Sequence, residues 1–346
     1  MDLNLKMPAE WETHSATQLH WPSNNETWPA ERLVRVEKVY LNIIKALHNY
    51  EPIHLFVADS IVEERATQLM NECDIDLSQI VFHTQKVNDV WARDCGPIFV
   101  QNEIGESVIL DWGYNAWGEK YPPFDADNYL PTYIASKFGI DKIEPNMILE
   151  GGSIDVNGEG LLLTTESVLL NKNRNPNLSK LDIEEHLKKY LGLDQVIWLK
   201  DGLEGDDTDG HIDDITRFLN KDTVLTMISE DKTDVNYLAL QENLEILKSV
   251  RLKGGRSLNI ETLPLPQTKI EGTTVDGSEY VPASYANFYI ANGVVLLPLY
   301  DKRYDQKAID LLSIYFPTRK VIGIDCADLV WGQGSIHCIT QQWYGI

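Results

Sequence analysis

Length, composition and charge describe an ordinary globular chain with a strong acidic excess. Its 346 residues can bury a large core, and 43% hydrophobic and 24% charged residues are typical of soluble proteins. With 53 acidic against 30 basic residues the net charge is −23, which repels nucleic acid and anionic membranes and attracts cations. No apolar stretch approaches the roughly 18 residues of a membrane span, and residues 1–10 contain no signal-peptide core.

Cysteine usage and linker content predict an undivided intracellular chain. The four cysteines lack CxxC spacing; they are Cys73, Cys95, Cys326 and Cys338. Reduced thiols and a cytoplasmic location are therefore expected. No low-complexity linker interrupts the sequence, so we expect one domain over residues 1–346.

Taken in chain order, the sequence repeats an apolar hairpin. Each has an apolar strand with a polar residue at one end, a short turn rich in Gly, Asn and Asp, and a second strand. The four predicted hairpins span residues 94–112, 152–164, 212–228 and 286–298. Asn157-Gly158 and Asn292-Gly293 favour tight turns, because both residue types tolerate positive φ.

Predicted helices fall between these hairpins, and each is followed by a strand. The pairs are Arg32–His48 with Ile53–Ala58, Ser60–Asn71 with Ile80–Phe82, Leu181–Tyr190 with Val196–Leu199, Asp234–Val250 with Leu258–Thr262, and Gln306–Tyr315 with Val321–Ile324. Asp94, Glu150, His211, Asn287 and Cys338 follow one another at spacings of 51 to 76 residues, which gives the length of each unit. Five such units predict an α/β repeat fold whose equivalent strand ends converge on one axis. A doubly wound α/β sheet is the competing prediction.

Candidate catalytic residues stand far apart in the sequence. Residues 334–342 place Cys338 in a polar, turn-rich setting that suits a reactive thiol. Upstream stand His211 and three carboxylates, Asp94, Glu150 and Asp213. A cysteine with a distant histidine and carboxylates is a candidate nucleophile and acid–base set, brought together by folding. His211 and Asp213, two positions apart, would share one face of a strand.

Six segments resemble the agmatine deiminase family, which belongs with the peptidylarginine deiminases in the guanidine-modifying superfamily. They are Trp91–Pro97, Glu150–Glu166, Asn171–Pro176, Asp207–Asp213, Tyr285–Tyr289 and the segment around Cys338. The resemblance implies a five-bladed α/β propeller of pseudo-fivefold ββαβ modules with the active site in its central channel. It also implies hydrolysis of agmatine to N-carbamoylputrescine and ammonia through a covalent amidino-cysteine, feeding putrescine and polyamine biosynthesis.

The resemblance also implies a role for each site residue. Cys338 would be the nucleophile, His211 the general acid and base, Asp94 and Asp213 the clasp on the guanidinium nitrogens, and Glu150 a third carboxylate near His211. These types suit the chemistry, since carboxylates match paired N–H donors and histidine titrates near neutral pH. Trp91 and Trp117 would wall the substrate channel, although core packing is an equal expectation. The carboxylates should raise the thiol pKa, so we expect the substrate cation to activate Cys338.

Neither a metal nor an organic cofactor is expected, because no zinc-type ligand spacing or phosphate-binding glycine loop stands in the chain. The expected partner is a small cationic guanidine, and a homo-oligomer is left open. Agmatine is the preferred substrate, with free arginine and peptidyl-arginine as alternatives. Two departures from the family pattern, in Gly205–His211 and Trp331–Cys338, would affect the pocket for the far end of the substrate.

Several other interpretations compete with these roles. An amidinotransferase or a hydrolase of methylated arginine would use the same nucleophile. A metallohydrolase would use Asp94, His211 and Asp213 as ligands, but HExxH is missing. Asp201–Asp214 resembles a calcium-binding loop only in its acidity, because the EF-hand template puts Gly205 and Thr216 at ligand positions. Arg93 is interpreted as structural, and His337 as facing away from Cys338 on a strand.

Overall fold

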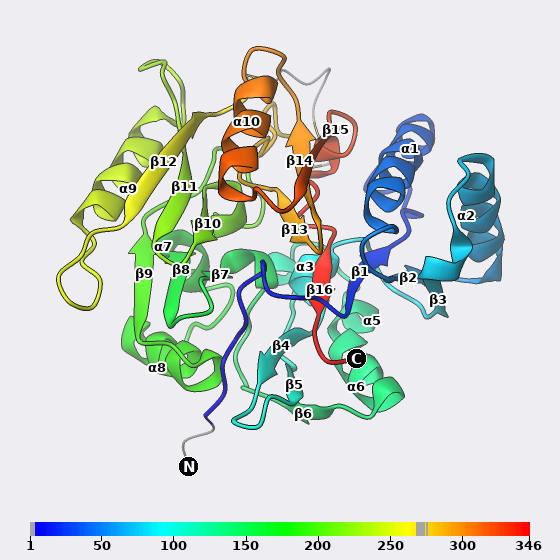
Figure 1. The fold of residues 1–346 in the computed structure, drawn as a ribbon, viewed down its shortest axis with the longest axis horizontal. Helices are drawn as coiled ribbons and strands as arrows, with labels where there is room; N and C mark the ends of the chain where they lie inside the picture. The colour runs from blue at the N-terminus through cyan, green and yellow to red at the C-terminus, as the bar shows by residue number, and fades with distance from the viewer. Residues whose placement is uncertain (1–3, 268–273, 275) are drawn as a thin grey trace.

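The fold consists of several small sheets with helices packed against them (Figure 1). The computed structural model describes residues 4–267, 274 and 276–346. Within these residues there are five sheets, four of three strands and one of four. The protein is therefore a mixed α/β fold. A single large sheet, as a doubly wound fold requires, is not present in the described residues.

Four of the sheets have the same strand order. Two antiparallel strands form a hairpin, and a helical segment then leads to a third strand parallel to the second. For example, β10 (Thr216–Asn220) and β11 (Thr223–Ile228) are followed by α9 (Tyr237–Ser249) and β12 (Asn259–Pro264). In the second sheet, β4 (Ile98–Gln101) and β5 (Ser107–Leu110) are followed by α6 (Leu130–Phe138) and β6 (Asp141–Ile143). In the third, β7 (Asp155–Val156) and β8 (Leu161–Thr165) are followed by α8 (Lys180–Leu191) and β9 (Gln195–Leu199). In the fourth, β13 (Tyr289–Ala291) and β14 (Val294–Leu299) are followed by α10 (Asp305–Tyr315) and β15 (Lys320–Asp325). Short helices α4 (Ala116–Glu119) and α5 (Asp125–Asn128) precede α6, and α7 (Glu166–Leu169) precedes α8.

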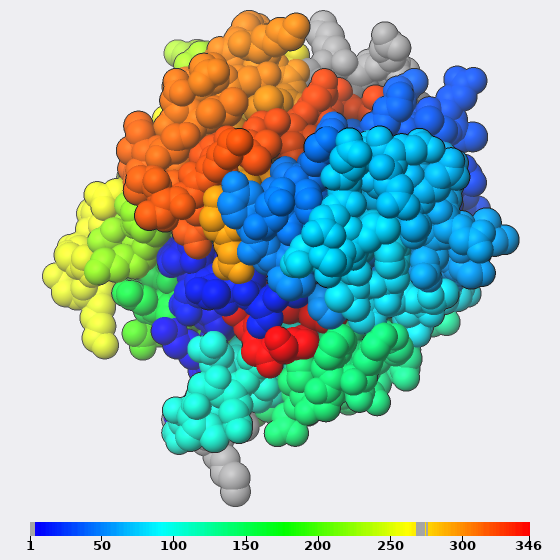
Figure 2. All heavy atoms as spheres, turned by 45° about the vertical axis from the view of Figure 1, so that its right-hand side comes forward, coloured from blue at the N-terminus to red at the C-terminus, as the bar shows by residue number. Residues whose placement is uncertain are grey.

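The fifth sheet joins the two ends of the chain, in the order β16-β1-β2-β3. Strand β16 (Gln341–Trp343) pairs antiparallel with β1 (Ala16–His20), and β1 pairs parallel with β2 (Ile53–Val57). Helix α1 (Ala30–Leu47) connects β1 to β2, and α2 (Ser60–Glu72) connects β2 to β3 (Ile80–Thr84). Figure 2 shows the C-terminal residues in red beside N-terminal residues in dark blue.

Local sequence explains where these elements begin and end. Helix α8 begins with a capping box, in which the side chains of Ser179 and Asp182 each accept the other's backbone N–H. It ends at Gly192, whose φ of 70° is left-handed. The turn between β13 and β14 contains Gly293 with a φ of 73°, as its Asn-Gly sequence predicts.

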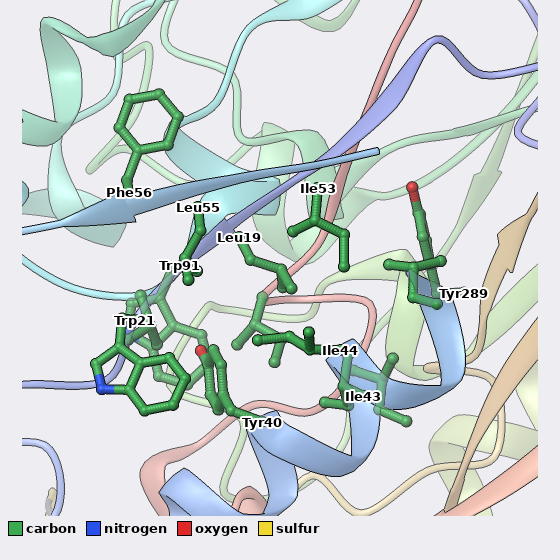
Figure 3. Close-up of a cluster of buried hydrophobic side chains, with 14 of the residues drawn as sticks. Leu19, Trp21, Tyr40, Ile43, Ile44, Ile53, Leu55, Phe56, Trp91 and Tyr289 are labelled. Atoms are coloured by element: carbon green, nitrogen blue, oxygen red, sulfur yellow. The ribbon is translucent and has the colours of Figure 1, made fainter. Parts of the chain in front are cut away.

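One face of α1 packs against β1 and β2 to form part of the largest buried cluster (Figure 3). Tyr40, Ile43 and Ile44 of α1 lie toward Leu19 and Leu55, and these five side chains have no solvent exposure. Their spacing of three and four residues puts them on one helix face. Burying each aliphatic side chain stabilises the fold by about 1.5–3 kcal/mol. None of the described helices is long and apolar enough to cross a membrane.

Most predicted helices and strands are present within a few residues of their expected bounds, but β1 and β16 are not predicted, and two other differences concern the units. The predicted pairs 32–58 and 60–82 belong to one sheet, not to two separate units. The sequence does not predict α6 and β6, which complete another sheet. Helix α6 has only nine residues, with Pro131 in its first turn and weak helix formers Thr132, Tyr133 and Ile134 next to it, so its periodicity is hidden.

Candidate active site

Five polar side chains occupy the same place in the five sheets, directly before the first strand of each antiparallel pair. Asp94 precedes β4, Glu150 precedes β7, Asp213 precedes β10, Asn287 precedes β13 and Cys338 precedes β16. All five are buried. The contacts described below bring Asp94, Asp213, Asn287 and Cys338 together, and the charge of Glu150 acts on Asp94 and His211.

Cys338 lies in a turn before β16, and its thiol is buried beside an amide and a carboxylate. Asn287 Nδ2 donates to Sγ over 3.1 Å, and Sγ lies 3.9 Å from Asp213 Oδ2. Asn287 Oδ1 accepts the backbone N–H groups of His337 and Cys338 at 2.8 and 3.4 Å. Asn287 therefore fixes both the backbone and the sulfur of Cys338.

His211 and Asp94 face each other across Gly152. His211 Nδ1 lies 3.7 Å from Asp94 Oδ1, which also accepts the backbone N–H of Gly152 at 3.0 Å. A Cβ atom on Gly152 would lie 2.6 Å from His211 Nδ1 and 2.8 Å from Asp94 Oδ1. The other oxygen of Asp94 accepts the indole N–H of Trp117 at 3.0 Å. Only glycine therefore permits this approach of histidine and carboxylate.

Glu150 is held by a buried arginine from a different segment. Arg174 Nε donates to Glu150 Oε1 over 2.5 Å, and Arg174 Nη1 donates to Asp209 Oδ2 over 2.6 Å. The bond to Arg174 fixes one oxygen of Glu150, and because the carboxylate is planar it also sets the direction of the second oxygen.

Burial and like charges shift the acid–base equilibria of the site. Burial, then Asp213 and Asp214, raises the pKa of the Cys338 thiol well above its usual range. Burial raises the pKa of Asp94 to about 6, although the charge of His211 opposes this shift. Burial alone would lower the pKa of His211, but the neighbouring carboxylates, Asp94 first, raise it overall. Without a cation, the site therefore favours a neutral thiol and a protonated histidine.

Three buried polar atoms of the site have no hydrogen-bond partner among the residues that the structure describes. They are Glu150 Oε2, His211 Nε2 and Asp213 Oδ1. A buried carboxylate oxygen without a donor costs about 1–3 kcal/mol or more. A ligand that supplies several N–H donors would remove this cost at both carboxylates.

A cavity of about 420 Å³ ends at the thiol. Four of the predicted site residues line it: Trp91, Asp94, Trp117 and Cys338. Glu150, His211 and Asp213 are not among the lining residues and have at most 1% exposure. Trp91 and Trp117 also pack edge to face, with ring centroids 6.2 Å apart, so they contribute to both the wall and the core.

Two local expectations are wrong and one is confirmed. His211 and Asp213 do not lie on a strand: His211 caps the 3-10 turn Ile212–Asp214. His337 does not face away from the site, because the segment is a turn in which Nδ1 lies 2.7 Å from Asp213 Oδ2. Arg93 is structural as predicted: it donates to the carbonyl of His337, to Gln342 and to Glu10.

Sequence reasoning assigned no site role to five residues that hold the predicted ones in place: Glu10, Arg174, Asp214, Arg217 and Asn287. Three of them carried a signal. Asn287 stands in the resemblance segment at the spacing of the other units, and Arg174 ends the Asn-Lys-Asn-Arg run. Arg217 is a cation next to the apolar residues Phe218 and Leu219 of its strand, which indicates buried anions beside it. Glu10, near the N-terminus, gave no local signal.

The grouping of possible metal ligands differs from the metallohydrolase interpretation. Among the described residues, one group of three brings its ligand atoms within 4.8 Å: Asp213, Asp214 and Cys338. Asp94 and His211 are not part of it, and the amide of Asn287 already donates to both Asp214 and the thiol. This set lacks histidine, the ligand on which that interpretation depended.

Comparisons with known proteins agree on one family. The family model described as Porphyromonas-type peptidyl-arginine deiminase matches residues 6–343. A protein of Legionella pneumophila (strain Paris) named "Putative agmatine deiminase" is 39% identical over 97% of this chain and 94% of its own. An agmatine deiminase structure from Enterococcus faecalis has a TM-score of 0.89 at 33% identity, and a C. jejuni agmatine deiminase with a Cys-to-Ser change and bound substrate has 0.87 at 34%. Each covers 98% of this chain and 96% of its own. The chain belongs to this peptidyl-arginine deiminase family, within the agmatine deiminase group, and the sequence resemblance is confirmed.

Proposed function

We propose that this chain is a hydrolase that converts agmatine to N-carbamoylputrescine and ammonia. One observation carries the proposal: Cys338 lines a cavity, and its buried Sγ lies 3.9 Å from the carboxylate of Asp213, whose other oxygen has no donor among the described residues. A guanidinium is planar and presents paired N–H donors, which suit such oxygens. The relatives named as agmatine deiminases support the substrate. The product would feed putrescine and polyamine synthesis.

The reaction follows from the roles that the residues can perform. Asp94, Asp213 and Glu150 would hold the guanidinium with its carbon against Cys338 Sγ. The Cys338 thiol first loses its proton to solvent in the cavity. The thiolate sulfur then attacks that carbon, a C–N bond breaks, and ammonia leaves with a proton from His211. Water then attacks the amidino carbon and gives a proton to His211. The C–S bond breaks, and the thiol and the ureido product are released.

Activation of the thiol would depend on the substrate. The raised pKa of Cys338 leaves little thiolate in the empty site. A guanidinium in contact with Asp94 and Asp213 cancels part of the negative charge that disfavours the thiolate. We therefore propose that the cation binds first and that deprotonation of Cys338 follows.

The charge of the cavity favours a substrate with a second cation. Five acidic and two basic side chains line the cavity: Glu26, Asp89, Asp94, Asp127 and Asp207 against Lys86 and Lys120. Burial raises the pKa of Asp127 to about 8, so at neutral pH the other four acidic side chains supply most of the negative charge. Burial raises the pKa of Asp207 to about 7, so a nearby ammonium would favour its ionised form. Asp207 and Gln333, in the two segments that depart from the family pattern, both line this cavity. Agmatine fits such a cavity better than arginine, whose carboxylate would be repelled.

We further propose that the five sheets are the blades of a five-bladed α/β propeller of ββαβ modules forming one domain over residues 1–346. The repeated strand order and the equivalent positions of Asp94, Glu150, Asp213, Asn287 and Cys338 support this arrangement. Free cysteines support a cytoplasmic location. Sedimentation analysis would test for a homo-oligomer.

Replacing the thiol tests the chemistry directly. We expect Cys338→Ala to abolish ammonia release from agmatine while the protein still folds, and Cys73→Ala, outside the site, to retain activity. Acid-quenched wild-type enzyme should carry an amidino adduct on Cys338 by mass spectrometry. Substantial turnover by Cys338→Ala would exclude the covalent route. A higher kcat/KM for arginine or peptidyl-arginine than for agmatine would retain the route and change the substrate.

A further inference from the structure

A buried group of charged side chains adjoins the thiol without lining its cavity. This rear cluster consists of six residues with at most 8% exposure: Glu10, Arg93, Asp155, Asp213, Arg217 and His337. None of them lines the cavity that ends at Cys338. Only Asp213 has a role in the proposed reaction, so the function of the other five needs its own explanation.

Glu10 is the anion that connects the rear cluster. Its Oε1 accepts the backbone N–H of Ile290 at 2.7 Å. Its Oε2 lies 2.8 Å from His337 Nε2, 3.1 Å from Arg217 Nη2 and 3.4 Å from Arg93 Nη2. Burial alone would raise the pKa of Glu10, but Arg217, His337 and Arg93 hold this pKa well below its usual range. Glu10 is therefore ionised at neutral pH.

The imidazole of His337 lies between two carboxylates. Its Nδ1 is 2.7 Å from Asp213 Oδ2, and its Nε2 is 2.8 Å from Glu10 Oε2. An ionised carboxylate can only accept hydrogen bonds, so if Glu10 and Asp213 are both ionised, each ring nitrogen carries a proton. The charges of the rear cluster then balance, because Arg93, Arg217 and the imidazolium offset Glu10, Asp155 and Asp213.

The charge on His337 acts on Asp213, the carboxylate nearest the thiol. Burial alone would raise the pKa of Asp213, but the hydrogen bond and charge of His337 hold it below its usual range. The same hydrogen bond fixes Oδ2 and leaves Oδ1 without a partner. A neutral His337 could keep this geometry, but it would remove the largest of the cationic influences that lower the pKa of Asp213, to which His211 and Arg217 also contribute.

We propose that Glu10 is a positioning residue of the reaction: it keeps His337 doubly protonated, and the imidazolium keeps Asp213 ionised with one oxygen free for the guanidinium. The role of Glu10 in the reaction rests on the proposed function, whereas the charge of His337 can be measured without turnover. The alternative is that Glu10 only anchors the N-terminal segment to β13 through Ile290. That role predicts lower stability and no change in protonation or pH profile.

The protonation of His337 can be observed directly. In protein with ¹⁵N-labelled imidazoles, the His337 signals are identified by their loss in His337→Gln. We expect both ring nitrogens to be protonated at pH 7.5 in the wild type. In Glu10→Gln, the amide can donate to Nε2, so we expect one nitrogen to be unprotonated. A neutral His337 in the wild type would overturn the proposal, whatever the substrate of the enzyme.

Kinetics separate positioning from anchoring, with Glu51→Gln as the matched control. Glu51 is also buried, lies 3.3 Å from His14 Nδ1 and accepts the backbone N–H of Asn292 at 2.8 Å, but does not contact Asp213. We expect Glu10→Gln to lower kcat/KM for agmatine by about ten- to a hundred-fold. We also expect its acid limb to move to higher pH, because the pKa of Asp213 then rises above that of Asp94, which sets the limb near pH 6 in the wild type.

Both control variants have defined outcomes. Glu10→Asp keeps the charge and should keep the acid limb near its wild-type position, and Glu51→Gln should lower thermal stability without moving the limb. An unmoved limb in Glu10→Gln, with a stability loss like that of Glu51→Gln, would leave only the anchoring role. Absence of any deiminase activity in the wild type would instead refute the proposed function, and the nitrogen signals of His337 would still decide the charge.

Discussion

A single methyl group at residue 152 should disable the site without disturbing the fold. Gly152 has no positive φ, so alanine suits its backbone. The added Cβ would lie 2.6 Å from His211 Nδ1, 2.8 Å from Asp94 Oδ1 and 3.1 Å from Asp213 Oδ2, whereas ordinary contacts begin at 3.4 Å. His211 must therefore retreat by roughly 0.8 Å, and a misplacement near 1 Å costs about a hundred-fold in rate, or about 2.7 kcal/mol of activation free energy.

Ammonia release measures the loss, and thermal unfolding separates it from misfolding. Gly323→Ala is the matched control, because its Cβ would lie 2.5 Å from the tip of Leu299, outside the site. We expect both variants to lose some stability, but only Gly152→Ala to lose kcat. A Gly152→Ala enzyme with kcat within about three-fold of wild type would refute the inferred placement of His211 and Asp94.

Two further substitutions test single hydrogen bonds. Trp117→Phe removes the indole N–H that lowers the pKa of Asp94. Because Asp94 must be ionised to hold the guanidinium, the acid limb of kcat/KM, expected near pH 6, should move to higher pH. An unchanged pH–rate profile would show that this hydrogen bond does not set the pKa of Asp94. Asn287→Asp replaces the donor to Cys338 Sγ by an anion, so we expect kcat to fall at least ten-fold. For the same reason, alkylation of Cys338 at pH 8 should be slower than in the wild type. Equal alkylation rates would contradict a role for Asn287 in stabilising the thiolate.

The sequence predicts the site residues better than it predicts the residues that hold them in place, for physical reasons. Asn-Gly turns and apolar alternation reveal the hairpins, so a polar residue at a strand start, such as Asp94, is visible locally, and a polar, turn-rich segment marks Cys338. Supporting contacts depend on pairings between distant segments. Glu10 and His337, for example, are 327 positions apart. No local pattern marks that pair, and the period-two face expected for His211 and Asp213 fails because a 3-10 turn precedes β10.

Helix α6 shows the limit of periodicity for the fold. Nine residues give little more than two turns, and branched or aromatic residues follow its proline, so packing against β5 and β6 decides its conformation. Strand β1 is hidden for another reason. It buries Thr17, Gln18 and His20 along with apolar residues, so it lacks the apolar character of a central strand.

The pairing of β1 with β16 has a consequence for biosynthesis. During translation β1 emerges before the other four sheets, whereas Cys338 and β16 emerge after them. Until then β1 has one unpaired edge, which is open to wrong partners. The growing chain also lacks Cys338, the proposed nucleophile. Catalytic competence therefore comes with closure of the first sheet, and unfinished chains carry a carboxylate-rich site that cannot attack a guanidine.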